Sequence, residues 1–118
     1  MNKVNVVGIK TFSYHGCLEE EAKIGNDYLV DIELITDFKE SAKNDDLSKT
    51  IDYVIVNRIV EEEMAIRSKL IETVGYRILR RLKQEAFLLN NARIEIKKIN
   101  PPINGNVSYV SIVVEEKC

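Results

Sequence analysis

The stretch DYVIVNRIVEEEMAIR, Asp52 to Arg67, runs directly into SKLIETVGYRILRRLKQEAF, Ser68 to Phe87, and this pair of segments decides the fold. In each segment apolar residues recur at the spacing of one helix face. The recurring positions are Ile55, Val56, Ile59, Val60 and Met64, then Leu70, Ile71, Val74, Ile78, Leu79 and Leu82. We therefore expect two consecutive amphipathic helices, with Ser68 as the N-cap of the second.

Strand patterns flank the two helices on both sides. The run YLVDIELITDF, Tyr28 to Phe38, puts apolar residues on one face and acidic residues on the other, as a half-buried antiparallel strand does. A partly alternating run, Val4 to Gly16, precedes it, and the runs ARIEIKKI and VSYVSIVVEE close the chain. The order ββααββ predicts an α+β fold: a four-stranded antiparallel sheet with two helices packed on one face.

The segments between these elements carry weaker signals. Residues 17–27 are expected to form a polar loop, and residues 39–50 a loop with one helical turn at most. A length of 118 residues fits one domain with a modest core. A four-stranded sheet also leaves two open edges, which are exposed to pairing with a neighbouring subunit.

Composition excludes several classes of function. The chain has 17 basic and 19 acidic residues, so no overall field attracts nucleic acid or an anionic membrane. The densest basic cluster, Arg77 to Lys83, is expected to be a solvated face that complements the helix dipole. No apolar run approaches the roughly 20 residues that span a bilayer, and the N-terminus lacks a signal-peptide pattern. We expect a cytoplasmic protein.

Metal-binding residues are scarce. His15 is the single histidine, whereas a catalytic zinc ion usually takes three protein ligands, commonly histidines or cysteines. Cys17 and Cys118 stand far apart without CxxC spacing, and we expect both to be reduced thiols. We therefore expect chemistry without a metal ion and without a cofactor.

The stretch KKINPPING, Lys97 to Gly105, raises a question about its second lysine. Pro101 and Pro102 fix φ and stiffen the chain, and the residue before a proline is pushed toward extended geometry. We expect Asn100 to be extended and Lys98 to end its strand on a rigid support. Judged on these residues alone, Lys98 is more often a solvated surface lysine than a positioned proton carrier.

Three other positions could carry chemistry. Glu19, Glu20 and Glu21 form a charge run that is usually solvated, although one of them can serve a site. Glu72 falls in the first turn of the second helix, where the dipole favours a carboxylate and free backbone amides could bind a flat heterocycle. Tyr53 starts the first helix, where an aromatic ring usually packs but its phenol can exchange hydrogen bonds. Singly, none of them decides a function.

The set of motifs, in this order, resembles the dihydroneopterin aldolase family, the folate-pathway members of the tunnelling fold. The resemblance covers essentially the whole chain. It rests on YHG at 14–16, EEEAKIG at 19–25, TIDY at 50–53, LIE at 70–72 and KINPP at 98–102. The chain departs from the family pattern at Ser68 and Lys69, where an asparagine is frequent, and at Asn104, where a proline commonly precedes the glycine.

The resemblance implies roles for individual residues. It implies catalytic roles for Lys98, Tyr53 and Glu21, and substrate binding by Glu72, Ile71, Leu70, Tyr53 and Glu21. The implied reaction is a metal-independent retro-aldol cleavage of 7,8-dihydroneopterin by a single domain spanning residues 1–118. The implied assembly is a homo-oligomer with sites between subunits, in four-subunit rings that often stack into an octamer.

Other functions remain open at this point. An epimerase of the same family, acting at C2′ of free or triphosphorylated dihydroneopterin, could use the same residues. A triphosphate specialist needs extra cations near its side-chain pocket, and the sequence identifies no such cluster. A non-catalytic pterin- or purine-binding module would keep Glu72 but leave Lys98 without a task. A zinc-dependent synthase or cyclohydrolase of the same fold is disfavoured by the single histidine, His15.

Overall fold

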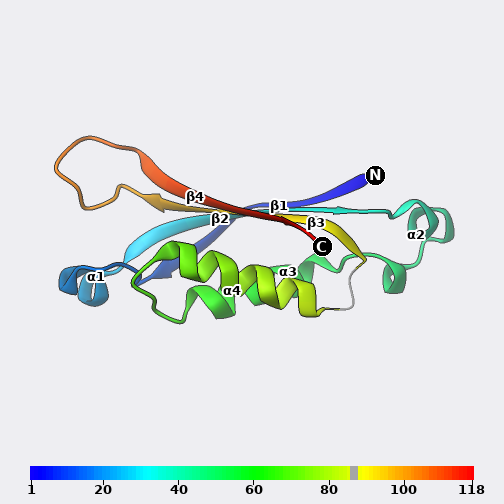
Figure 1. Ribbon diagram of the computed structural model, residues 1–118, viewed down its shortest axis with the longest axis horizontal. Helices are drawn as coiled ribbons and strands as arrows, with labels where there is room; N and C mark the ends of the chain where they lie inside the picture. The colour runs from blue at the N-terminus through cyan, green and yellow to red at the C-terminus, as the bar shows by residue number, and fades with distance from the viewer. Residues whose placement is uncertain (86–87) are drawn as a thin grey trace.

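The computed structural model describes the chain except for residues 86–87, and for Lys49 it describes the backbone alone. The elements in chain order are β1 (Asn2–Ser13), α1 (Glu19–Ile24), β2 (Asn26–Thr36), α2 (Lys39–Asn44), the 3-10 turn η1 (Leu47–Lys49), α3 (Tyr53–Met64), α4 (Ile71–Gln84), β3 (Leu89–Ile99) and β4 (Tyr109–Lys117). Figure 1 shows the sheet as one layer, with α3 and α4 beneath it.

The strands form an antiparallel sheet in the order β1-β2-β3-β4, so β1 and β4 are its edges. The helices α3 and α4 cover the same face of this sheet (Figure 1). The short helices α1 and α2 lie at opposite ends of the molecule. The expected α+β architecture, with two long helices on one face of a four-stranded sheet, is confirmed.

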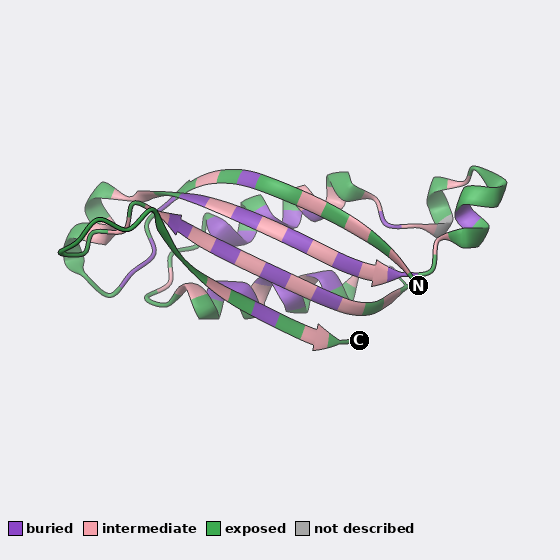
Figure 2. Cartoon of the chain, turned by 90° about the horizontal axis from the view of Figure 1, so that it is seen from above, coloured by how far each residue is buried: buried purple, intermediate pink, exposed green. Residues whose placement is uncertain are grey.

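Strand alternation separates a buried face from a charged one. In β2 the inward row, Tyr28, Val30, Ile32 and Leu34, is buried. Figure 2, which looks onto the sheet, shows buried and less buried residues alternating along β2 and β3. On the outward face Asp31 pairs with Lys97 at 3.0 Å and Glu33 pairs with Lys3 at 3.7 Å. The apolar core therefore lies between the sheet and the two long helices.

The structure corrects the predicted loops. Residues 17–27 contain α1, whose first turn holds three glutamates that the helix dipole favours. Residues 39–50 contain α2 and η1 instead of a single helical turn. Glu21, which the sequence placed in a loop, therefore projects from a helix.

The second long helix also begins later than predicted. Ser68 is not its N-cap: Leu70 occupies that position and α4 starts at Ile71. The predicted end at Phe87 lies outside the described residues, and α4 itself ends at Gln84. Ser68 instead belongs to the connection between α3 and α4, where its polar groups have other partners.

Candidate active site

Lys98 lies at the inward-facing end of β3. The inward row of this strand is Ala92, Ile94, Ile96 and Lys98, and all four are buried. Because side chains alternate between the two faces of a strand, Lys98 shares the helix-covered face with the core residues before it. Only 8% of Lys98 is exposed. A charge buried to this extent is costly unless it is paired, so the ammonium group needs partners.

Two acceptor groups bind the ammonium of Lys98. It forms an ion pair with Oε2 of Glu21 and donates a hydrogen bond to the carbonyl oxygen of His15 at 3.3 Å. The other carboxylate oxygen of Glu21 accepts the backbone N–H of Leu18 at 3.1 Å. Burial raises the pKa of Glu21, but these hydrogen bonds and the charges of Lys98 and Arg67 outweigh burial and lower it. The carboxylate therefore remains ionised beside the ammonium.

Gly16 provides the space that Glu21 needs to reach Lys98. Its φ is +141°, a backbone conformation that residues with a Cβ rarely adopt. A Cβ on Gly16 would lie 2.3 Å from the carboxyl carbon of Glu21. The glycine of the YHG motif thus allows the carboxylate to pack directly against the main chain.

Arg67 fixes the loop that carries Gly16. Its Nε donates to the carbonyl of Tyr14 at 2.9 Å, and its Nη2 donates to the carbonyl of Gly16 at 2.8 Å. In return, the backbone N–H of Gly16 donates to the carbonyl of Ser68 at 3.0 Å. The loop after β1 is thereby joined to the connection between α3 and α4, although the two are about fifty residues apart in sequence.

The end of β3 is held by asparagines as well as by the double proline. The side-chain amide of Asn26 donates to the carbonyl of Ile99 at 2.6 Å, and the N–H of Asn100 donates to the carbonyl of Ser108 at 2.9 Å. The prediction of an extended Asn100 was wrong, because its φ is +46°. Asparagine tolerates this left-handed conformation, which turns the chain immediately after the strand of Lys98.

Leu70, Ile71 and Glu72 form the start of α4. Figure 1 shows this start at the same end of the molecule as the end of β3, the strand that carries Lys98. Leu70 is the N-cap, and its apolar side chain accepts no hydrogen bond from the first backbone N–H groups of the helix. Glu72 is exposed in the first turn. Among the described residues, no hydrogen bond or ion pair joins Glu72 to Lys98 or Glu21.

Tyr53 lies apart from these residues within one chain. It is the first residue of α3 and is 66% exposed. The other end of α3, at Met64, leads into the connection that bonds to Gly16. With a rise of about 1.5 Å per residue, Tyr53 stands about 16 Å along the helix axis from Met64. The structure therefore brings Glu21 and Lys98 together, with the start of α4 at the same end, and leaves Tyr53 toward the other end.

The described residues contain no group of three or more His, Cys, Asp or Glu side chains that could hold a metal ion. None of the described helices is both long enough and apolar enough to cross a membrane. Cys17 and Cys118 are both exposed and free.

Known proteins resemble this chain along its whole length. The family model described as "FolB: Dihydroneopterin aldolase" matches residues 4–115. The dihydroneopterin aldolase of Streptococcus pyogenes serotype M18 is 34% identical over 121 residues and aligns across 99% of both chains. That of Bacillus subtilis is 32% identical, with 99% of this chain and 98% of its own covered. The chain belongs to the dihydroneopterin aldolase family.

The fold of the dihydroneopterin aldolase family is also visible in a solved structure. The Escherichia coli dihydroneopterin aldolase, in complex with neopterin, superposes with a TM-score of 0.89 at 22% identity, covering 98% of this chain and 99% of its own. At that identity the likeness shows a shared fold. The resemblance expected from the sequence is confirmed, together with the tunnelling fold and an aldolase-type enzyme of folate biosynthesis.

Three residues at this site had no role predicted from sequence: Tyr28, His15 and Arg67. The hydroxyl of Tyr28 donates to the carbonyl of His15 at 3.2 Å. Burial, helped by the charge of Glu21, raises the pKa of Tyr28 to about 12, so the phenol keeps its proton. A signal was present, because three polar residues are buried at one end of the sheet: Tyr28 near the start of β2, Lys98 near the end of β3, and His15 two residues after β1.

Proposed function

We propose that this protein cleaves 7,8-dihydroneopterin into 6-hydroxymethyl-7,8-dihydropterin and glycolaldehyde without a metal ion or cofactor. The observation that carries the proposal is the buried ion pair of Lys98 and Glu21, at the same end of the molecule as the start of α4, in a chain of the dihydroneopterin aldolase family. We also take residues 1–118 to be one domain of this kind, acting in the cytoplasm, where its two free cysteines stay reduced.

The substrate supplies the electron sink. Most aldolases use a lysine Schiff base or a metal ion to accept the electrons of the broken bond. In 7,8-dihydroneopterin the carbon of the ring C=N bond itself bears the side chain, so C1′ is attached directly to the imine carbon. When the C1′–C2′ bond breaks, its electron pair moves into this imine and forms an enamine. The protein must therefore bind the ring, remove the proton of the 2′-hydroxyl and deliver a proton to C1′.

Lys98 is the proton carrier in this scheme. Its side chain projects from a strand, and a catalytic group that is fixed in the correct orientation accelerates the reaction through orientation alone. Glu21 contacts the same ammonium and lies where a hydroxylated side chain of the substrate can exchange hydrogen bonds with it. Lys98 and Glu21 thus move the proton between the 2′-hydroxyl and C1′, directly or through one water.

The start of α4 binds the pterin ring. The carboxylate of Glu72 accepts hydrogen bonds from the 2-amino group and a ring N–H of the pterin. Such charge-assisted paired bonds are roughly twice as strong as neutral ones and fix orientation. Backbone groups near Leu70 and Ile71 satisfy other polar edges of the ring, and the uncapped N-terminus of α4 supports this role. The E. coli relative, which was solved with neopterin, supports a pterin as the ligand.

Tyr53 completes the site from a neighbouring subunit. Its exposure and its distance along α3 from the Lys98 end support a role in a second chain's pocket. The open edges β1 and β4 can pair between chains, since unpaired strand edges template further pairing. The assembly proposed is a ring of four subunits, with two rings stacked into an octamer. Size-exclusion chromatography with light scattering measures the mass of this assembly, and an octamer is expected.

The same groups allow epimerisation at C2′. If glycolaldehyde turns over before it leaves, recombination with the enamine returns the substrate with inverted C2′. This side reaction needs no further residue, because it reverses the proton transfers already assigned to Lys98 and Glu21.

The test is incubation of purified protein with 7,8-dihydroneopterin in the presence of EDTA, followed by chromatographic separation of the products. Equal amounts of 6-hydroxymethyl-7,8-dihydropterin and glycolaldehyde support the proposal, and a dihydromonapterin peak measures the epimerase share. Loss of activity in EDTA contradicts the metal-independent reaction. Tight binding of the pterin with no product indicates a binding module instead of an enzyme.

A further inference from the structure

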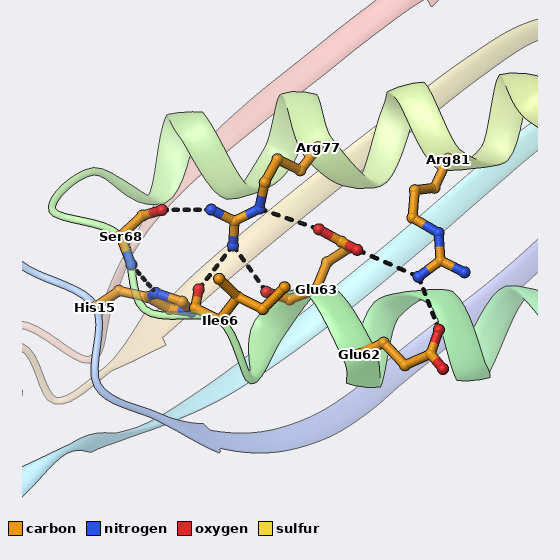
Figure 3. A network of polar contacts seen from close by, with 7 residues as sticks. All are labelled: His15, Glu62, Glu63, Ile66, Ser68, Arg77 and Arg81. Atoms are coloured by element: carbon orange, nitrogen blue, oxygen red, sulfur yellow. Dashed lines mark hydrogen bonds and ion pairs between the residues drawn. The ribbon is translucent and has the colours of Figure 1, made fainter.

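The side chain of His15 is buried in a position that the proposed reaction does not use. It is 1% exposed, and its Nδ1 accepts the backbone N–H of Ser68 at 3.0 Å (Figure 3). A ring nitrogen that accepts a hydrogen bond carries no proton, so a neutral His15 is protonated on Nε2. Among the described residues, Nε2 has no hydrogen-bond partner of ordinary geometry.

The main chain of the same residue holds the proposed proton carrier. The carbonyl oxygen of His15 accepts from Lys98 Nζ at 3.3 Å and from the hydroxyl of Tyr28 at 3.2 Å. The rings of His15 and Tyr28 meet edge to face, with centroids 5.5 Å apart. The side chain of His15 is thus bonded to the α3–α4 connection, while its carbonyl is bonded to the ammonium of Lys98.

A second hydrogen bond makes this attachment a clamp. The N–H of Gly16 donates to the carbonyl of Ser68, so Ser68 both donates to and accepts from the His15–Gly16 segment. Ser68 is itself held, because Arg77 donates to its Oγ and to the carbonyls of Glu63 and Ile66 (Figure 3). Ser68, the far side of this clamp, is therefore held in place by residues of both α3 and α4.

Ser68 also stands two residues before the N-cap of α4, which begins the proposed pterin-binding segment. One set of contacts thus fixes the distance between the Lys98 ammonium and the start of α4. Arg77 contributes to it from within α4, and its Nε pairs with Glu63 of α3 at 3.1 Å. The prediction of a solvated basic face was wrong for Arg77, whose guanidinium is mostly buried in this network.

Burial, together with the charges around it, favours the neutral form of the His15 ring. Burial lowers the pKa of His15 to about 4. The nearby cations Arg77, Lys98 and Arg67 act in the same direction, while the Met64 carbonyl acts against them. Near pH 7 the ring is therefore uncharged and lies beside the Lys98 ammonium without repelling it.

We propose that His15 is a positioning residue of this enzyme, whose Nδ1–Ser68 hydrogen bond sets the place of Lys98 relative to the pterin-binding start of α4. This inference rests on the proposed function, because it takes Lys98 as the proton carrier. It adds that the acceptor at Nδ1, and not the bulk of the ring, is the feature that turnover needs.

Two substitutions separate these possibilities. His15→Asn keeps an acceptor at the position of Nδ1 and loses ring volume, whereas His15→Phe keeps a ring and leaves the Ser68 N–H without its acceptor. Since small displacements of a reacting group cost up to about 100-fold, we expect His15→Phe to lower kcat by roughly 10- to 100-fold with little change in KM. We expect kcat of His15→Asn to stay within about threefold of wild type.

The melting transitions of both variants are recorded first, to establish that they fold. Steady-state kinetics with 7,8-dihydroneopterin then test the inference. Full turnover by His15→Phe overturns the inference, and so does a loss in His15→Asn as large as that in His15→Phe. A wild-type enzyme that does not cleave the substrate overturns the proposed function instead.

A measurement on the wild type keeps the inference testable if either variant fails to fold. Because His15 is the single histidine, a long-range ¹H–¹⁵N spectrum contains one imidazole. We expect the tautomer with the proton on Nε2 near pH 7. A proton on Nδ1 excludes the hydrogen bond from Ser68 and overturns the inference.

Discussion

Lys98 and Tyr28 lie opposite each other in the antiparallel register of β3 and β2, and both donate a hydrogen bond to the carbonyl oxygen of His15. One donor is an ammonium, and the other is a phenol that burial keeps protonated, with a pKa of about 12. Because both come from neighbouring central strands, the position of the ammonium depends on sheet register rather than on a surface loop. Groups built on strands are placed more accurately than groups on loops.

Replacement of the buried lysine tests its role directly. We expect Lys98→Ala to lower kcat by about 10²- to 10⁴-fold, the usual contribution of a general acid–base group, while pterin binding is kept. The matched control is Lys97→Ala, because the neighbouring lysine faces the other side of the sheet and pairs with Asp31 at 3.0 Å. Stopped-flow turnover and equilibrium binding of neopterin are measured for both. Normal turnover by Lys98→Ala contradicts its assignment as proton carrier.

Glu72 is expected to act on binding more than on turnover. Each hydrogen bond to a charged group contributes about 1.5–3 kcal/mol, so Glu72→Ala should raise the Kd for neopterin roughly 100-fold or more. Since Glu72 is exposed, its replacement should change the free energy of unfolding by less than about 0.5 kcal/mol. Fluorescence titration gives Kd, and Glu61→Ala on α3 serves as the exposed-carboxylate control. An unchanged Kd for Glu72→Ala removes it from the pterin site.

A mixing experiment tests whether Tyr53 serves a neighbouring subunit. Lys98→Ala and Tyr53→Ala are each expected to be nearly inactive as pure oligomers. When equal amounts are dissociated and reassembled together, random association gives about one site in four with both wild-type residues, if they come from different chains. Activity should then recover to about a quarter of wild type. No recovery means that each chain supplies its own Tyr53.

Much of the fold was predictable because it follows from local periodicity. The buried face of β2 and β3 follows from the alternation of apolar residues, and that of α3 and α4 from their helical spacing. All these faces are buried together only if the two helices pack on one face of the sheet. The short helix α1 was missed because its six residues include no buried position, so no periodic signal exists. The left-handed Asn100 was missed because the turn to Ser108 overrides the preference imposed by the following proline.

The site was predictable only in part. Lys98 and Glu21 came from motif resemblance, and the structure joins them in one ion pair. His15 was given no role of its own: it counted as part of the YHG motif and as an argument against a zinc site. Its hydrogen bond to Ser68 crosses more than fifty residues of sequence. Polar contacts between residues far apart in sequence produce no periodic pattern in the sequence. The alternation of β1 could still have indicated a buried His15, because Ile9 and Ser13 are inward residues of β1 and His15 continues the same alternation two residues beyond its end.

The network around Arg77 is expected to contribute to stability. Its guanidinium bonds to the side chain of Glu63 and to the main chain at the end of α3, so Arg77→Met leaves a buried carboxylate with less compensation. Since Arg81 still contacts Glu63 at 3.2 Å, we expect a loss of about 2–3 kcal/mol in the free energy of unfolding, below the full cost of breaking a buried pair. Urea unfolding checks this, with the exposed Arg80→Met as control. Equal unfolding midpoints for the two variants contradict the prediction.

His15 should make the protein less stable in mild acid. The ordinary pKa of 6.5 falls to about 4 in the folded chain, first through burial and then through the nearby cations. Between these values the unfolded chain binds more protons, so the stabilisation is complete above about pH 6.5 and is lost as the pH falls toward 4. The full loss is about 3 kcal/mol, of which about 2 kcal/mol is reached by pH 5. Urea unfolding at pH 7 and pH 5, at one fixed protein concentration, measures it. Because the chain has a single histidine, His15→Asn removes this component and leaves the carboxylates in place. The same loss between the two pH values in wild type and His15→Asn means that other groups cause it.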